Sequence, residues 1–174
     1  LNMMHFMADC RASVEPVPSA DHVMKELEAS LVLYFTGVSR ESAAIIDEQR
    51  ANMKSHSTRP LEGLHALKAG AFEMRDALLA GDVPGFGALL DAGWSSKKKL
   101  AHNISSSDID KVYDAAKAFG VIGGKVSGAG GGGFMMFLVD PTQREGLKRL
   151  LSTFGGTAQA ARFTNVGAES WIVR

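Results

Sequence analysis

A glycine-rich run at residues 123–133 restricts this chain more than any other feature of its sequence. Seven of these eleven residues are glycine, and each ordered glycine costs about 0.5–1 kcal/mol relative to alanine in regular structure. A loop of exposed backbone N–H groups that wraps an anion needs such bare backbone, and phosphate is the anion most often bound in this way. A tight turn or a linker is the structural alternative, but a turn needs only one or two glycines. We therefore predict a phosphate-binding loop.

The residues around the loop exclude two common nucleotide-binding motifs. Gly128, Gly130 and Gly133 fit the spacing G-x-G-x-x-G, but a dinucleotide site needs a helix directly after the loop and an acidic residue about 20 positions later. Here a continuous apolar run, 134–139, predicts a strand, and residues 147–167 contain no acidic side chain. A Walker loop is excluded because no Gly-Lys-Ser/Thr ends the run. The loop is thus predicted to join two strands and to contact an anion through backbone alone.

Composition favours one soluble globular domain. The 174 residues carry a formal net charge of zero and 45% hydrophobic residues, so the sequence offers no broad basic surface for nucleic acid or a membrane. The single cysteine, Cys10, excludes an internal disulfide and favours a reducing compartment. No signal peptide or apolar stretch of about 20 residues is visible. We interpret the protein as cytoplasmic, and the five scattered histidines predict no metal site.

The hydrophobic pattern predicts strands separated by helices. Strands are expected at 6–15, 31–35, 124–127, 134–139, 158–163 and 170–173, and helices at 21–28, 40–53, 60–80, 83–103, 108–119 and 141–154. Ser19, Ser39 and Asp82 are expected N-caps, and Ser107 with Asp110 suggests a capping box. The last two strands would form a hairpin across 165–167. The expected fold class is α+β, with one antiparallel sheet covered by helices on one face.

The first predicted strand, 6–15, alternates apolar and polar residues without a break. A half-buried antiparallel strand of this kind needs a neighbouring strand. Leu1 is also not a start methionine. We therefore expect the sequence to be the second part of a longer polypeptide.

A second group of residues lies on the predicted helix 83–103. Trp94, Lys97, Lys98 and Ala101 are spaced so that an indole and two ammonium groups share one helix face. Lysine binds phosphate through rotatable donors, and an aromatic ring can cover a sugar. Alternatively, the lysines are a solvated helix end that complements the helix dipole and Trp94 is a core residue. Without the glycine loop, that alternative would be preferred.

Taken together, segments 94–100, 107–110 and 123–134 resemble the C-terminal half of GHMP-type small-molecule kinases, and most closely that of the D-glycero-D-manno-heptose 7-phosphate kinases. The glycine run is similar to the third motif of the superfamily. Segment 34–40 also resembles the heptose kinase pattern after its second strand. The resemblance covers nearly the whole chain.

This resemblance implies that residues 1–174 form a single GHMP kinase C-terminal domain, with a ferredoxin-like antiparallel sheet. The family's Gly-Ser-Ser phosphate loop, catalytic aspartate and magnesium ligands belong to an N-terminal domain that this sequence does not contain. No catalytic residue and no metal ligand is therefore assigned here. ATP and Mg²⁺ would be bound mainly by that N-terminal domain, which would be the main partner, and the isolated chain would be inactive.

For the whole enzyme, the resemblance implies transfer of the γ-phosphoryl group of ATP to the anomeric hydroxyl of a heptose 7-phosphate, a reaction dominated by positioning and charge stabilisation. Residues near the nucleotide phosphates would be Ser127, Gly128, Ala129, Gly130, Gly131, Gly132 and Gly133. Lys97 and Lys98 would hold the phosphate of the acceptor, Trp94 would shape the sugar pocket, and Thr36 and Arg40 would lie at its edge.

Two other functions stay open at this stage. One is a ferredoxin-like regulatory module that binds a small ligand, and the other is a GHMP kinase for a different sugar or for a mevalonate-type substrate. Only the Trp-Lys-Lys helix argues against the second. The sequence also leaves open the stereochemistry of the acceptor, the anomer, and the oligomeric state, a homodimer included.

Overall fold

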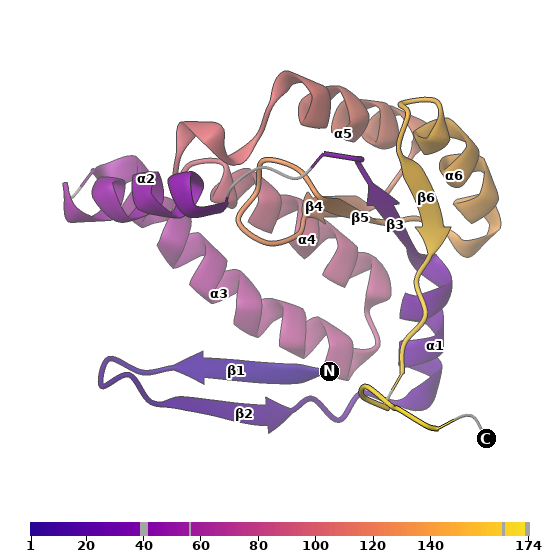
Figure 1. Ribbon diagram of the computed structural model, residues 1–174. Coiled ribbons are helices and arrows are strands. Elements are labelled where there is room, and N and C mark those ends of the chain that lie inside the picture. The colour runs from indigo at the N-terminus through magenta and orange to yellow at the C-terminus, as the bar shows by residue number, and fades with distance from the viewer. Residues whose placement is uncertain (39–41, 56, 165, 173–174) are drawn as a thin grey trace.

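The computed structural model describes residues 1–38, 42–55, 57–164 and 166–172. At its centre is a four-stranded antiparallel sheet in the order β4-β5-β3-β6 (Figure 1). The strands are β3 Leu31–Phe35, β4 Gly123–Val126, β5 Phe134–Leu138 and β6 Thr157–Ala160. The predicted strands 31–35, 124–127 and 134–139 are confirmed to within one residue. The glycine loop joins β4 to β5, as expected.

Six α-helices are present in the described residues, at α1 Asp21–Ser30, α2 Ser42–Lys54, α3 Thr58–Ala80, α4 Val83–Lys97, α5 Ser107–Phe119 and α6 Arg144–Ser152. Two short 3₁₀ helices, η1 His102–Ile104 and η2 Pro141–Gln143, connect some of them. The long helix α3 ends at Gly81, whose φ of 75° is left-handed and whose N–H bonds back to the last turn. None of the helices in the described ranges is long and apolar enough to cross a membrane.

The main core lies on one face of the sheet. Paired residues of antiparallel strands share a face, so Tyr34, Met135 and Val126 form one row across it. These three side chains are at most 1% exposed and pack against Trp94 and the inner face of α5 in one cluster. In Figure 1, α5 and α6 cover this face. The predicted α+β fold is confirmed.

The opposite face is covered at one end only. Leu138 packs there with Val23 and Leu27 of α1 and with Val83 in the first turn of α4. Toward the glycine loop, Phe35 and Phe134 are 37% and 43% exposed, and their rings lie 4.9 Å apart. This end of the face has no cover among the described residues.

The predicted strand 6–15 is wrong, because the chain turns within it. The segment is a hairpin of β1 Asn2–Phe6 and β2 Ala12–Pro16. Cys10 has a φ of 65°, and the Asp9 carboxylate accepts a hydrogen bond from the Arg11 N–H, which fixes the turn. Alternation continued through the turn residues and concealed it. The alternation also did not predict which side chains are buried, since Phe6 is 81% exposed.

The predicted C-terminal hairpin is also wrong. β6 pairs with β3, and residues 161–164 and 166–172 contain no strand. The chain leaves the sheet at this point because the Phe163 N–H bonds to the Glu28 carboxylate on α1, at 2.5 Å. Asn165 and Val173, which belong to the predicted hairpin, lie outside the described residues.

Helix α4 ends at Lys97 rather than near residue 103. The Leu100 N–H bonds to the Lys97 carbonyl, which tightens the chain into a turn, and Ala101 is then extended. The Asn52 side chain donates to the Leu100 carbonyl at 2.9 Å and stabilises this exit. Ala101 therefore does not share a helix face with Trp94, contrary to the sequence prediction.

The helix caps differ in detail from those predicted. Asp82 caps α4 as expected, accepting from the Gly85 N–H at 2.8 Å. For α5 the N-cap is Ser106, one residue before the predicted Ser107, so the predicted capping box is wrong. The N-cap of α1 is Ala20 rather than Ser19. Ser39, the cap predicted for α2, lies outside the described residues.

Candidate functional site

The glycine loop is anchored to two segments that are distant in sequence. Gly131 donates its N–H to the Ile104 carbonyl at 2.8 Å, and Gly133 donates to the Val38 carbonyl at 2.7 Å. The Thr36 N–H returns a bond to the Gly133 carbonyl at 2.9 Å. These bonds tie the loop to η1 and to the chain after β3, so it has a defined shape. The linker alternative is excluded.

Close packing explains why so many glycines are needed. Gly128, Gly130, Gly131, Gly132 and Gly133 all have φ between 74° and 145°, where other residues are strained. At Gly130 a Cβ atom would lie 2.6 Å from the Ile104 carbonyl oxygen, and at Gly132 it would lie 2.7 Å from that of Val38. A simple turn does not require five such positions within six residues.

The loop borders a hollow of about 230 Å³, and most of the lining residues belong to the loop itself. The lining residues are Ser42, Ser127, Gly128, Ala129, Gly130, Gly132, Gly133 and Phe134. Within the described parts of the chain, the N–H groups of Gly128, Ala129, Gly130 and Gly132 have no hydrogen-bond acceptor. Free amide donors around a hollow of this size fit the oxygens of a phosphate group.

Ser42 is a residue of this hollow that the sequence interpretation missed. It is the first residue of α2, where the helix dipole places partial positive charge and favours anions. A serine near a predicted helix start is a signal for such a residue, but the pattern there favours Ser39 as the N-cap.

The two lysines of the predicted phosphate site have different surroundings. Lys97 is half-buried and its ammonium group donates to the Gly128 carbonyl, which joins α4 to the glycine loop. Burial lowers the pKa of Lys97, and the positive charge of Lys125 lowers it further. Lys98 lies 3.6 Å from the Asp110 carboxylate and above the Trp94 ring, 5.8 Å from its centroid.

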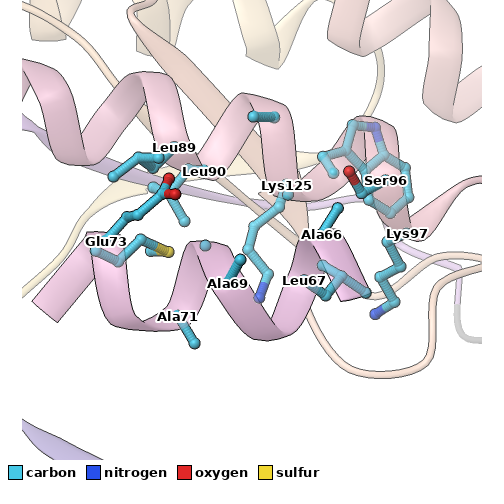
Figure 2. Close-up of a pocket in the computed structure, with 15 residues that line it drawn as sticks. Ala66, Leu67, Ala69, Ala71, Glu73, Leu89, Leu90, Ser96, Lys97 and Lys125 are labelled. Atoms are coloured by element: carbon cyan, nitrogen blue, oxygen red, sulfur yellow. The ribbon is translucent and has the colours of Figure 1, made fainter. Parts of the chain in front are cut away.

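Trp94 is a core residue with 1% of its surface exposed, and its ring centroid lies 6.3 Å from that of Tyr113. It also forms part of the wall of a pocket between α3 and α4, which Lys97 and Lys125 line as well (Figure 2). The lysine residues are therefore distributed between two sides of Trp94, with Lys97 at this pocket and Lys98 at the start of α5.

Thr36 and Arg40 were the weaker candidates. The Thr36 hydroxyl donates to the Val38 carbonyl at 3.0 Å. This contact supports the segment that anchors Gly133, so Thr36 lies at the base of the loop. Arg40 lies outside the described residues.

A buried hydrogen-bond network supports the strand that leads into the loop, and the sequence interpretation did not find it. The Tyr113 hydroxyl lies within hydrogen-bond distance of both the Asp91 carboxylate and the Gly124 carbonyl, the latter at 2.9 Å. Burial and the Asp91 carboxylate raise the pKa of Tyr113, so it keeps its proton. Lys117 lies 3.2 Å from the other Asp91 oxygen.

No cluster of three or more histidine, cysteine or acidic side chains that could hold a metal ion occurs in the described ranges. The glycine loop fits phosphate oxygens but offers no carboxylate for a divalent cation. A phosphate-bound magnesium ion would thus need ligands from elsewhere.

Comparisons with known proteins agree with this arrangement. A family model described as "GHMP kinases C terminal" matches residues 74–156, which include α4, α5 and the glycine loop. The chain is 37% identical over 172 residues to a D-glycero-alpha-D-manno-heptose 7-phosphate kinase of Campylobacter jejuni, a match that covers 99% of this chain and 50% of the relative.

Two crystal structures are similar over almost the entire chain. A D-glycero-D-manno-heptose 1-phosphate kinase from Bacteroides thetaiotaomicron superposes with a TM-score of 0.67 and 31% identity, covering 99% of this chain and 45% of that structure. A putative sugar kinase from Campylobacter jejuni gives a TM-score of 0.70 and 35% identity, with 98% and 47% coverage. The chain spans about half the length of these relatives. It belongs to the GHMP kinases and carries their C-terminal domain.

Proposed function

We propose that this chain is the C-terminal half of an ATP-dependent sugar kinase that phosphorylates the anomeric hydroxyl of D-glycero-D-manno-heptose 7-phosphate. One observation carries the proposal. A loop of five positive-φ glycines borders a hollow of about 230 Å³ and carries backbone N–H groups with no acceptor among the described residues, in a chain 37% identical to a heptose phosphate kinase.

In this proposal residues 1–174 act as one domain, and the other half of the kinase supplies the catalytic base and the ligands of Mg²⁺. Residues 127–133 lie near the phosphates of ATP and stabilise negative charge through backbone donors. Ser42 adds the N-terminus of α2 to the same region. The enzyme works in the cytoplasm, and whether it forms a homodimer stays a separate question for solution measurements.

For the acceptor phosphate, the surroundings of the two lysines favour Lys97 over Lys98. Lys97 already touches the glycine loop, whereas the Asp110 carboxylate partly neutralises Lys98. An acceptor phosphate bound at Lys97 would lie beside the loop, with Thr36 and Arg40 at the edge of the sugar site. Trp94 would support this site from the core rather than stack openly on the sugar, because it is buried.

Steady-state kinetics on the protein encoded by the complete reading frame test this function. ADP release is measured with heptose 7-phosphate, galactose, fucose and mevalonate as acceptors, and ³¹P NMR identifies the product. We expect turnover with the heptose phosphate and a new anomeric phosphate signal. Faster turnover of another acceptor would indicate a different GHMP kinase. Absence of turnover together with tight binding of an unrelated metabolite would support the regulatory module instead.

Two matched variants test the lysine assignment in the same assay. Lys97→Met should raise the KM for the acceptor by about tenfold or more, because a charge-assisted hydrogen bond is lost, with little change in the KM for ATP. Lys99→Met, an exposed neighbour, is the control and should leave both constants unchanged. Equal effects of Lys97→Met on the two KM values would contradict an acceptor role.

A further inference from the structure

The pocket between α3 and α4 is a feature of the structure that the proposed kinase reaction does not fully use. Its volume of about 440 Å³ lies within the range of roughly 300–1,000 Å³ that is typical of small-molecule sites. Small residues leave space between the two helices there, among them Ala66, Ala69, Gly70, Ala92 and Gly93. Leu67, Met74 and Leu90 add larger apolar walls. The pocket is therefore mainly apolar and is built by side chains of both helices.

The positive charges of this pocket lie apart from its negative charge. Figure 2 shows Lys125 reaching from the sheet between the helices, with Lys97 farther along on the same side, and Glu73 at the opposite end. Both lysines are half-buried. In the described residues neither of them has a carboxylate within ion-pair distance. Lys125 is close enough to lower the pKa of Lys97 by repulsion.

Two half-buried ammonium groups that repel each other are stabilised by an anion between them. The apolar walls next to them favour a ligand that also has an apolar body. Glu73 at the far end disfavours a second negative charge there, so the preferred ligand carries a single anionic group at one end. Sugar phosphates lack the apolar body that these walls require.

We propose that the pocket between α3 and α4 binds a small amphipathic anion, an apolar chain or ring with one terminal carboxylate or phosphate, whose anionic group lies between Lys97 and Lys125. This binding site is separate from the hollow of the glycine loop. Binding here requires neither ATP nor a sugar, but the site shares Lys97 with the proposed acceptor site, so an amphipathic anion would compete with the acceptor phosphate for that ammonium group.

Occupancy of this pocket is coupled to the glycine loop through one contact. The Lys97 ammonium group donates one of its three N–H groups to the Gly128 carbonyl, and a bound anion would accept from another. The ligand therefore acts on the position of a group that contacts the loop. In a GHMP kinase this would let the level of an amphipathic anion influence the loop that lies next to the reacting phosphates.

Isothermal titration of the 174-residue chain, with folding checked by circular dichroism, tests the proposal. The probes are octanoate and octyl phosphate, compared with neutral octanol, cationic octyltrimethylammonium and inorganic phosphate. Both octyl anions should bind at least tenfold more tightly than the three comparison compounds. Shortening octanoate should weaken binding about threefold to fourfold for each methylene removed. Equal binding of octanol and octanoate, or of inorganic and octyl phosphate, would overturn the proposal.

Two variants assign the binding to this pocket. A Cβ atom at Gly70 meets no atom within 4 Å, so Gly70→Leu fills the pocket without a clash in a helix that leucine favours. It should abolish binding while the melting temperature is kept or raised. Lys125→Met should weaken binding about tenfold, and Lys99→Met, the control, should not. Wild-type affinity of Gly70→Leu would refute the assignment.

Two further readouts address the coupling and the rival ligand. On addition of octanoate, the amide NMR signals of Gly128 and Ala129 should shift in the wild type but not in Gly70→Leu. Unchanged signals on a chain with bound octanoate would refute the coupling. Heptose 7-phosphate binding more tightly than octyl phosphate in this pocket would show that it is the acceptor site, and would overturn the amphipathic-anion proposal.

Discussion

Replacing Gly130 by alanine should destabilise the chain more than the same replacement at Gly128. Both residues have positive φ, 114° and 74° respectively, and an L-residue in the left-handed region costs about 1–2 kcal/mol. At Gly128 nothing lies within 4 Å of an added Cβ, so strain is the whole cost. At Gly130 the new Cβ would lie 2.6 Å from the Ile104 carbonyl oxygen, which accepts the Gly131 hydrogen bond.

Losing that hydrogen bond adds about 0.5–1.5 kcal/mol, so Gly130→Ala should cost about 1.5–3.5 kcal/mol in total. For a chain of this size the melting temperature should fall by about 3–14 °C, at about 2–4 °C per kcal/mol. Thermal unfolding followed by circular dichroism measures both variants under one condition. Equal melting temperatures for Gly128→Ala and Gly130→Ala would refute the packing argument for the loop.

Three further predictions concern the supports of the site. Trp94→Ala should lower the free energy of unfolding by about 3–5 kcal/mol in urea titrations, because the indole is 1% exposed. A loss below about 1 kcal/mol would show that Trp94 is not a core residue. Tyr113→Phe should cost about 1–3 kcal/mol, because the Gly124 carbonyl loses this donor and the Asp91 carboxylate is left with Lys117. An unchanged urea midpoint would contradict the network. The folded-state pKa of Lys97 is lowered from 10.5, so between the lowered value and pH 10.5 the unfolded chain binds more protons than the folded chain. The wild type should therefore gain stability relative to Lys97→Met as pH rises through that window. A difference in unfolding free energy that falls with pH would refute the desolvation of Lys97.

The sheet strands and the glycine loop could be predicted from sequence because local signals agreed with the fold. The apolar runs at β3 and β5 are short, rich in large residues and bounded by glycine or proline, and buried strands produce this pattern. Gly81 and Asp82 marked a helix end and a helix start through their own backbone preferences. At these positions the tertiary structure has the same conformation that the local sequence favours.

Local pattern failed where a distant contact decided the structure. The exit of α4 after Lys97 depends on Asn52, whose side chain bonds to the Leu100 carbonyl across 48 positions in sequence. The chain leaves β6 because Glu28 accepts the Phe163 N–H, a contact across 135 positions. The hairpin of β1 and β2 was missed for a different reason, since its turn residues happen to continue the apolar alternation.

The candidate site was predicted in part for the same reason. A cluster of glycines in the sequence indicates by composition alone a loop that binds through its backbone, so this loop could be predicted. The separation of Lys97 from Lys98 could not, because it depends on where α4 ends and on the position of Asp110 in α5. Ser42 enters the hollow only through the folding of α2 beside the loop.

The most direct test of the phosphate-loop proposal is hydrogen exchange at the loop amides of the protein from the complete reading frame, with and without a non-hydrolysable ATP analogue, Mg²⁺ and the heptose phosphate. The amides of Gly128, Ala129, Gly130 and Gly132 should exchange at least tenfold more slowly in the complex, because phosphate oxygens accept their hydrogen bonds. Unchanged exchange at these four amides in a fully liganded enzyme would contradict the phosphate role of the loop.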